Sequence, residues 1–295
     1  MSDQNNPVVG PVLAIIGGTG LYQFPALKDI ESIEVDTPFG KPSSPIIIGR
    51  LHGVKVAFLA RHGIGHFIMP HEVNYRANIY ALKQLGVHRV IGVNACGSLR
   101  EDYAPGEIVI PDQLVDFTRK RANTFFGEGL VAHVGTADPF CPDLSAQMYK
   151  AVVEAGGYVH QSGTLITVEG PRFSTKGESN MFRAWGMDII GMTTSPEAFL
   201  AREAEMCYAC MAHVTDYDVW HITEETVSVE MVIRTLHNNA QLAQKSISLL
   251  LKNLLPDTTC QCGKALENTI MTAPERIPPE TRQKLGLLVD KYLSK

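Results

Sequence analysis

Residues 17–20, Gly-Gly-Thr-Gly, could form an anion-binding loop. Three glycines surround Thr19, so the backbone can approach a ligand closely and the Thr19 hydroxyl can donate to it. The segment is not a dinucleotide-binding G-x-G-x-x-G loop, because Gln23 stands at the last glycine position, and it lacks the Gly-Lys of a Walker A loop. A tight turn explains these residues as well as an anion site does.

Two further segments contain residue types that suit an oxyanion. Arg61 and His62 follow the apolar run 54–60; a guanidinium fork matches the oxygens of phosphate, and His62 can donate beside it. A lone Arg after a strand normally makes a surface ion pair, but two glycines and a second histidine share this loop. Residues 94–98 follow the run 90–93 and are small, so their backbone N–H groups could form an anion-binding nest, or else a tight turn.

Other segments could hold a sugar or a base. The turn at 169–172 places Phe173, an apolar platform, beside Ser174. Met192 could cover a sugar or a base, and Thr193 beside it could donate to an anion. As residues at the end of an apolar run, both are also explained by ordinary packing.

Asp216 and Asp218 come directly after the apolar run 206–214. Two carboxylates at a buried strand end cost free energy unless they serve a ligand. An ionised carboxylate can accept from an exocyclic amine, and a protonated one can donate to a ring nitrogen. The alternative is a pair of aspartates that cap a turn. Together with the anion-binding segments, the pattern indicates phosphate bound beside a flat heterocycle.

Strand-like and helix-like segments alternate along the chain. This pattern predicts a layered α/β domain with a largely parallel sheet, in which ligands bind at the carboxyl ends of the strands. We expect one domain, residues 1–255, and a C-terminal helical extension, residues 256–295, packed on the same domain or on a neighbouring subunit. The expected strands are 12–16, 45–49, 54–60, 90–93, 107–110, 163–168, 188–192 and 206–214, and the expected helices are 74–85, 146–155, 179–185, 195–204, 228–255 and 279–293.

The composition is that of a globular protein. Of the 295 residues, 45% are hydrophobic and 19% are charged, and the net charge is −5. This mild acidity argues against nucleic acid or an anionic membrane surface as a partner. The apolar runs are far shorter than the ~20 residues that span a bilayer. The polar N-terminus has no signal-peptide pattern, so we expect a cytoplasmic protein.

The six cysteines do not predict a metal site. Cys207 and Cys210 have C-x-x-C spacing, but in a strand they point to opposite faces, which favours ordinary core cysteines. Cys260 and Cys262 lie in a polar segment and could form a strained disulfide, although reduced thiols are the default in the cytosol. A zinc site is disfavoured, because no second Cys or His pair lies at ligand spacing nearby.

Several segments together resemble 5'-methylthioadenosine phosphorylases, members of the trimeric purine nucleoside phosphorylase family. The similar segments occur in order from about residue 10 to residue 255 and are specific as a set: 16–21, 61–63, 69–70, 73–75, 95–99, 138–142, 169–174, 192–194 and 215–220. The resemblance implies an α/β nucleoside phosphorylase-like layered domain with a mixed, distorted central sheet flanked by helices, and a homotrimeric assembly.

The resemblance also assigns site residues. It implies that Met192 lines the ribose and that His133 reaches the 5' end of the substrate in a neighbouring subunit. Ser174 and Val229 fall where the family sets its choice of base and of 5' group. Gly191 replaces an Asn that is common in relatives. The phosphate site would consist of Thr19, Arg61, His62, Asn94, Ala95 and Thr193; Asn94 stands where many relatives have Thr or Ser, and its amide could still donate.

The implied reaction is phosphorolysis of S-methyl-5'-thioadenosine to adenine and 5-methylthioribose 1-phosphate, which serves purine and methionine salvage. Such a pentosyltransferase needs no metal or organic cofactor, because inorganic phosphate is a co-substrate. Asp216 would be the catalytic acid that protonates N7, and Asp216 and Asp218 would read the adenine edge. An apolar 5' pocket rejects a hydroxyl only by ~10 to 200-fold, so we expect some cleavage of adenosine.

Three alternatives stay open. A 6-oxopurine or methylthioinosine phosphorylase would need a donor facing O6, where this chain has Asp216 and Asp218. A hydrolase would use water, and the residues that suit phosphate argue against it. A non-catalytic nucleotide-binding module would have less reason to place Asp216 at a buried strand end.

Overall fold

The computed structural model describes residues 12–18, 24, 26–221, 229–255 and 259–293. Its strands form one sheet with the order β2-β3-β4-β1-β5-β10-β9-β7; β11 pairs with β5 and β6, and β8 pairs with β6. The strands are β1 (Leu13–Gly17), β2 (Lys28–Ile33), β3 (Ile46–Leu51), β4 (Val54–Ala60), β5 (Arg89–Ser98), β6 (Ile108–Val109), β7 (Gln113–Phe117), β8 (Val159–His160), β9 (Thr164–Val168), β10 (Ile189–Gly191) and β11 (Cys207–Asp216).

The sheet is mixed, as the resemblance implied. Strand β5 lies in its middle and runs parallel to β1 and β11, whereas β10 pairs with the end of β5 in the antiparallel sense. The pairs β2–β3 and β3–β4 are antiparallel as well. Since β5 and β11 are almost entirely buried, their Val, Ile, Ala and Cys residues form the centre of the domain.

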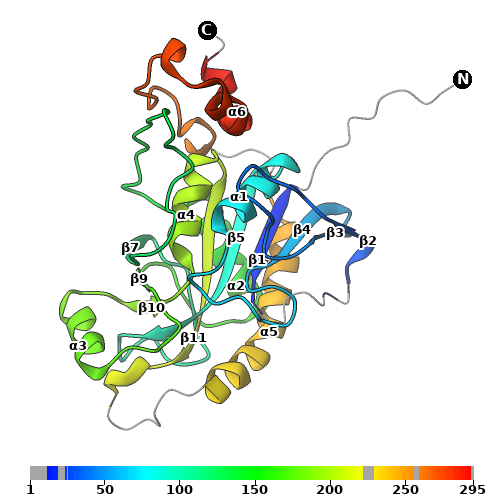
Figure 1. Ribbon diagram of the computed structural model, residues 1–295. Coiled ribbons are helices and arrows are strands. Elements are labelled where there is room, and N and C mark those ends of the chain that lie inside the picture. Colours follow the sequence, from blue (N-terminus) through cyan, green and yellow to red (C-terminus); the bar gives the residue numbers. More distant parts are fainter. Residues whose placement is uncertain (1–11, 19–23, 25, 222–228, 256–258, 294–295) are drawn as a thin grey trace, which may run out of the picture.

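Helices cover both faces of the sheet. Along β1, Ala14 and Ile16 belong to the core on one face, together with residues of α1, α4 and α6, and Leu13 and Ile15 belong to the core on the other, together with residues of α2 and α5. Figure 1 shows α3 at the lower left and α6 at the top, beside the C-terminus. The helices are α1 (Tyr75–Gln84), α2 (Pro142–Ala155), α3 (Lys176–Ala184), α4 (Thr194–Glu203), α5 (Val229–Lys252) and α6 (Pro279–Leu293), with 3-10 turns at Asp218–Trp220, Cys262–Lys264 and Pro274–Arg276.

Every helix and strand expected from the sequence is present, with ends that differ by a few residues. One local expectation is wrong: residues 94–98 are not a turn or a nest. They continue β5, because β11 and β10 supply pairing partners up to Gly97 and Ser98. The short strands β2, β7 and β8 were not expected; β2 is polar and exposed, so no apolar run marks it. Cys207 and Cys210 do point to opposite faces of β11.

The helices of the described residues include none that is both long and apolar enough to cross a membrane. The amphipathic α5 is the longest of them, and its apolar side, with Ala243, Ile247, Leu250 and Leu251, is buried against the sheet and α2. Its sequence pattern is therefore explained by packing within the domain.

Candidate active site

A cavity of about 680 Å³ lies where β4, β9, β10 and β11 end and along the second half of β5. It therefore lies at carboxyl ends of strands, as the sequence pattern predicted. The cavity brings together many of the residues singled out in the sequence: Arg61, His62, Asn94, Ala95, Phe173, Ser174, Met192, Thr193, Asp216, Asp218 and Val229.

Two predicted site residues are not part of this cavity. Thr19 lies outside the described residues, although Gly18 beside it lines the cavity. His133 is exposed and does not line the cavity of its own chain; its backbone N–H donates to the Thr269 carbonyl oxygen.

Arg61 is almost completely buried and stays ionised. Its Nε and Nη2 donate to the two carboxylate oxygens of Glu197 at 2.8 Å each, and Nη2 and Nη1 donate to the carbonyls of Ile16 (3.2 Å) and Val93 (3.1 Å). Burial alone would lower the pKa of Arg61, but the charge and hydrogen bonds of Glu197 raise it above its ordinary value. Of the five N–H donors of a guanidinium, one on Nη1 has no partner among the described residues and is available to an anion in the cavity.

His62 is held in its neutral form. Burial and the Arg61 charge lower its pKa to about 4. Its Nδ1 lies 2.9 Å from the Ile68 carbonyl oxygen, which can only accept, so Nδ1 carries the proton. The neutral ring thus offers Nε2 as an acceptor and not as the donor that the sequence suggested. Such an acceptor suits the O–H of a hydrogen phosphate or of a sugar.

The side-chain amide of Asn94 points into the protein. Its Nδ2 donates to Thr194 Oγ1 (2.7 Å) and Cys210 Sγ (3.3 Å), and its Oδ1 accepts from Thr193 Oγ1 at 3.4 Å. Both amide hydrogens are therefore used inside the protein. In this arrangement Asn94 orients Thr193 and Thr194, and the donation to an anion that the sequence suggested is not free to occur.

Asp216 and Asp218 form the acidic end of the cavity. Both are buried, and burial raises the pKa of Asp216 and raises that of Asp218 to about 6. Asp216 accepts from the Thr215 hydroxyl at 2.6 Å and from the Asp218 backbone N–H at 2.8 Å. The Oδ2 atom of Asp218 has no hydrogen-bond partner among the described residues.

Gly97 makes room for this acidic pair. A Cβ atom at position 97 would lie 3.0 Å from Asp216 Oδ1 and 3.2 Å from the Cβ of Asp218. Any larger residue here would push the carboxylates out of place. At Gly191, by contrast, a Cβ atom would meet only the Ala95 carbonyl oxygen at an ordinary 3.6 Å.

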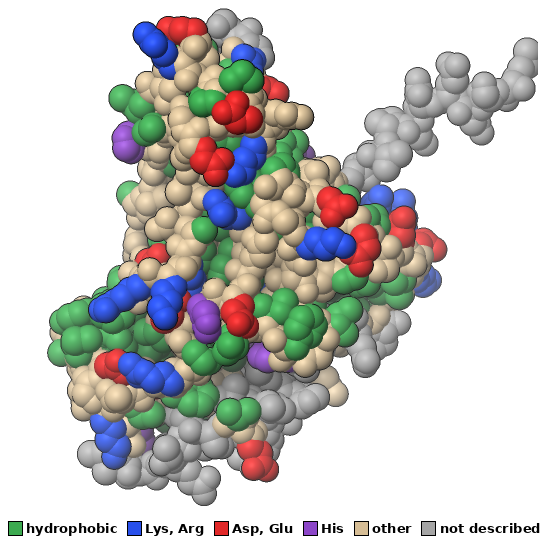
Figure 2. All heavy atoms as spheres, viewed as in Figure 1, with side chains coloured by type: hydrophobic (Ala, Val, Ile, Leu, Met, Phe, Trp, Pro, Cys, Tyr) green, Lys and Arg blue, Asp and Glu red, His purple; other side chains and the backbone are tan. Residues whose placement is uncertain are grey.

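Apolar side chains surround the cavity, and several are partly exposed. Phe67, Met69, Phe173 and Val229 line it and are 72%, 42%, 37% and 63% exposed. Figure 2 shows hydrophobic side chains gathered in the lower part of the molecule, at the level of α3 and β10 in Figure 1. Exposed apolar residues at the rim of a cavity commonly mark a surface that a partner or ligand covers.

Sequence reasoning missed Arg121, which holds the walls of the cavity together. Its buried guanidinium pairs with Glu169, and Nη1 donates to the carbonyl oxygens of Met192 and Ser195 at 2.7 Å each. The segment after β9 is thereby fixed to the junction of β10 and α4. Arg121 stands in a run of three basic residues, Arg-Lys-Arg. Such a run is typical of an exposed surface, so the sequence did not indicate a buried structural role for Arg121.

Glu197 and His213 were missed too. Glu197 is fully buried in α4 and accepts from the Tyr208 hydroxyl as well as from Arg61. His213 lies on β11 and lines the cavity; burial lowers its pKa to about 4, and neither ring nitrogen has a partner among the described residues.

Comparison with known proteins decides the family. A sequence model of the phosphorylase superfamily matches residues 12–255. The chain belongs to this superfamily. The S-methyl-5'-thioadenosine phosphorylase of Geobacter sulfurreducens is 50% identical over 283 residues, which cover 96% of this chain and 99% of that protein. The resemblance seen in the sequence is thus confirmed.

Solved structures of phosphorylases share the fold. A methylthioadenosine phosphorylase from an antarctic soil metagenomic library superimposes with a TM-score of 0.90 at 46% identity, covering 95% of this chain and 99% of the other. The methylthioadenosine phosphorylase of Schistosoma mansoni, solved in complex with adenine, gives a TM-score of 0.82 at 37% identity, covering 87% and 96% of the two chains.

Proposed function

We propose that this phosphorylase cleaves S-methyl-5'-thioadenosine with inorganic phosphate and releases adenine and 5-methylthioribose 1-phosphate. The observation that carries the proposal is one cavity with a buried guanidinium, Arg61, at one end and two buried carboxyl groups, Asp216 and Asp218, at the other. The relatives named above, which are methylthioadenosine phosphorylases, support the choice of substrate. The two products would return to methionine and purine salvage.

The reaction needs stabilisation of charge at both ends of the bond that breaks. Departure of adenine leaves positive charge on the ribose ring. Phosphate held beside Arg61 and Thr193 would stabilise that charge and attack C1'. Proposed phosphate contacts at Thr19, His62 and Ala95 complete this end, while Asn94 acts by orienting Thr193. No metal or organic cofactor takes part in this scheme.

The acidic end would protonate and recognise the base. The raised pKa of Asp216 favours a protonated carboxyl that donates to N7, so adenine leaves neutral. Asp218, which lines the cavity, would accept from the 6-amino group. A 6-oxopurine has a carbonyl oxygen in place of the 6-amino group. This oxygen only accepts, as the ionised Asp218 carboxylate does, so the two could not form a hydrogen bond and a 6-oxopurine is disfavoured. Met192 and Phe173 would pack against ribose and base, and Ser174 and Val229 would influence the choice of base and 5' group.

We also propose a homotrimer in which His133 completes the site of a neighbouring subunit. His133 is exposed outside its own cavity, and Phe67 and Met69 leave an apolar rim for a neighbour to cover. Light scattering should give the mass of three chains, and His133→Ala should raise KM for methylthioadenosine and leave KM for phosphate unchanged. A fully active single chain in solution would contradict this part of the proposal.

The experiment that tests the function measures adenine release from methylthioadenosine with and without inorganic phosphate, with adenosine and methylthioinosine in parallel. Phosphate-dependent release, fastest with methylthioadenosine, is the expected result. Release without phosphate would identify a hydrolase, and a preference for methylthioinosine would overturn the roles of Asp216 and Asp218. Asp216→Asn should lower kcat at least tenfold and change KM for phosphate little, because general acid catalysis is worth about 10²–10⁴-fold.

A further inference from the structure

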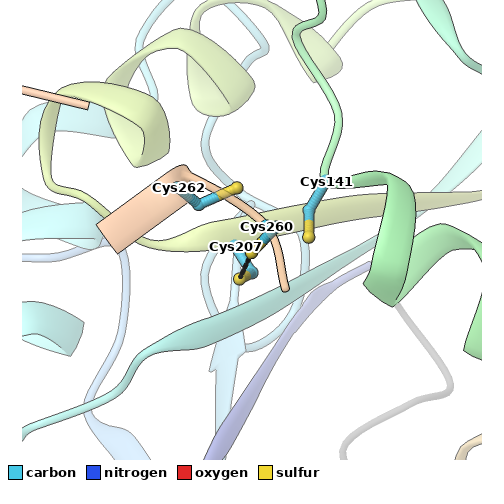
Figure 3. A group of neighbouring side chains, drawn as sticks. All are labelled: Cys141, Cys207, Cys260 and Cys262. Carbon is cyan, nitrogen blue, oxygen red and sulfur yellow. Dashed lines mark hydrogen bonds between the residues drawn. The ribbon is translucent and has the colours of Figure 1, made fainter. Parts of the chain in front are cut away.

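Four cysteines meet in one cluster on the face of the sheet that α2 and α5 cover. Cys141, Cys207 and Cys262 are buried and Cys260 is partly buried. All four sulfur atoms lie within 4.8 Å of one another, and Cys207 Sγ and Cys260 Sγ are 3.4 Å apart. Figure 3 shows side chains from three separate parts of the chain in this cluster. This cluster could not be predicted from the sequence, because its cysteines are up to 121 positions apart.

We propose that Cys141, Cys207, Cys260 and Cys262 bind one structural zinc ion. In a tetrahedral tetrathiolate site with Zn–S bonds of about 2.3 Å, neighbouring sulfur atoms are about 3.8 Å apart. All four sulfur atoms lie within 4.8 Å of one another, and those of Cys207 and Cys260 are 3.4 Å apart, so small movements would bring the set to that spacing. Thiolate sulfur is the ligand type that selects zinc among common divalent ions.

Two features near the cluster would stabilise negative charge on its sulfur atoms. Cys141 is the N-cap residue of α2, where the helix dipole stabilises negative charge, and its side chain makes no capping bond. Arg202 Nη1 lies 3.4 Å from Cys262 Sγ. A zinc tetrathiolate carries net negative charge, which Arg202 would partly compensate.

The chain also presents the ligands from a supported backbone. The Asp143 carboxylate accepts from the backbone N–H of Cys260 at 2.9 Å and from that of Thr259 at 2.7 Å. The backbone N–H of Cys141 donates to the Tyr208 carbonyl oxygen at 2.8 Å, next to Cys207. These bonds fix the segment that follows α5 to the start of α2 and the start of β11. Bound zinc would therefore tie the C-terminal segment to the phosphorylase domain.

Disulfides are the competing fate of these thiols. A disulfide needs two sulfur atoms about 2.0 Å apart, whereas Cys207 Sγ and Cys260 Sγ are 3.4 Å apart. One disulfide would also leave two thiols in the cluster without a partner. Zinc satisfies all four sulfur atoms at once with small movements.

The proposal is tested by metal analysis of the full-length protein, produced with Zn²⁺ in the medium and purified without chelator. We expect one zinc per chain, and we expect its loss in Cys260→Ser and in Cys262→Ser. Cys210→Ala is the matched control, because Cys210 is also a buried thiol of β11 but lies on the opposite face. It should keep one zinc per chain.

Two further measurements keep the test decisive if a variant folds poorly. Co²⁺ added to the metal-free wild-type chain should give the visible and near-ultraviolet absorption of a tetrahedral thiolate site, and a zinc chelator should lower the Tm. Intact mass and thiol titration report disulfides. Wild-type protein without zinc, whether its cluster thiols are free or paired as disulfides, would overturn the proposal.

Discussion

The buried Arg61 both pairs with Glu197 inside the protein and keeps one donor for a ligand. Four of its five donors are satisfied inside the protein by Glu197 and two carbonyl oxygens, so the guanidinium is fixed in one orientation before any ligand arrives. Glu197 itself is held by Tyr208. Binding of an anion by Arg61, which lines the cavity, would therefore not carry the entropy cost of ordering a long side chain.

We expect Glu197→Ala to destabilise the protein severely, since it leaves the Arg61 charge buried without a partner. Breaking a buried ion pair by removing one member costs about 3–5 kcal/mol. Asp102→Ala is the control, because Asp102 pairs with Arg100 at the surface and such a pair contributes about 0–1 kcal/mol. Urea unfolding of both variants measures the difference. Equal, small effects would show that Arg61 does not depend on Glu197.

The proposed role of Asp218 predicts a pH dependence for adenine binding. The pKa of Asp218 is raised to about 6 by burial, and its ionised form accepts from the 6-amino group more strongly than its neutral form. Affinity for adenine should therefore be greatest above pH 6 and fall as the pH drops through the pKa, by up to about tenfold per unit. Calorimetric titration between pH 5 and pH 8 measures this. Asp218→Asn should bind more weakly and show no such change; an unchanged pH profile in the variant would contradict the role.

At the level of single residues, the sequence predicted the site residues that stand at strand ends. It did not predict the buried residues that hold these site residues in place. Arg61, Met192 and Asp216 follow apolar runs, so the pattern places them near ligands. Arg121 and Glu197 act through partners tens of residues or more away, and in the sequence both read as surface charges. Their roles depend on tertiary contacts that no local pattern contains.

At the level of elements, the ends of β9 and β10 matter most, because the segments that follow them form the cavity wall. Arg121 is the link between these segments: it donates to the carbonyl oxygens of Glu169, Met192 and Ser195. The strands were predictable from apolar runs, but the continuation of β5 through residues 94–98 was not. Small residues followed by Ser resemble a turn unless the flanking strands are known.

We therefore expect Arg121→Met to reduce kcat/KM by about 100-fold, since a displacement of about 1 Å in a positioned group has an effect of this size. Arg119→Met is the matched control, because Arg119 is exposed and its guanidinium makes a distant contact, 5.9 Å, with the Phe117 ring centroid. Initial rates with varied methylthioadenosine compare the two variants. An equally large loss of kcat/KM in Arg119→Met would show that the effect comes from the loss of a surface charge and not from the contacts of Arg121.

At the level of the whole molecule, α6 belongs to the same core cluster as α1 and α4. Leu285, Leu288 and Val289 are buried in it, and the Tyr80 hydroxyl donates to the Lys284 carbonyl oxygen at 3.2 Å. The sequence predicted this helix, but left open whether it packs on the same domain or on a neighbouring subunit. Amphipathic spacing shows that a helix is half buried and does not identify the partner.

Adjacent leucines of α6 give a direct test of its contribution. Leu288 is 2% exposed and Leu287 is 44% exposed. Leu288→Ala should lower the free energy of unfolding by about 2–5 kcal/mol. Leu287→Ala should change it by about 0.5 kcal/mol or less. Thermal or urea unfolding at one protein concentration compares them, and similar values for both would mean that α6 does not stabilise the domain.

Strand β5 carries Asn94 near the phosphate end of the cavity and Gly97 beneath the two carboxyl groups. Three residues of extended chain span about 10 Å, and β5 is hydrogen-bonded along this stretch within the sheet. The strand therefore sets the distance between the proposed phosphate site and the two carboxyl groups. Ser174 and Val229, which also line the cavity, come from other segments, so substitutions there would reshape the cavity wall and leave the spacing along β5 unchanged.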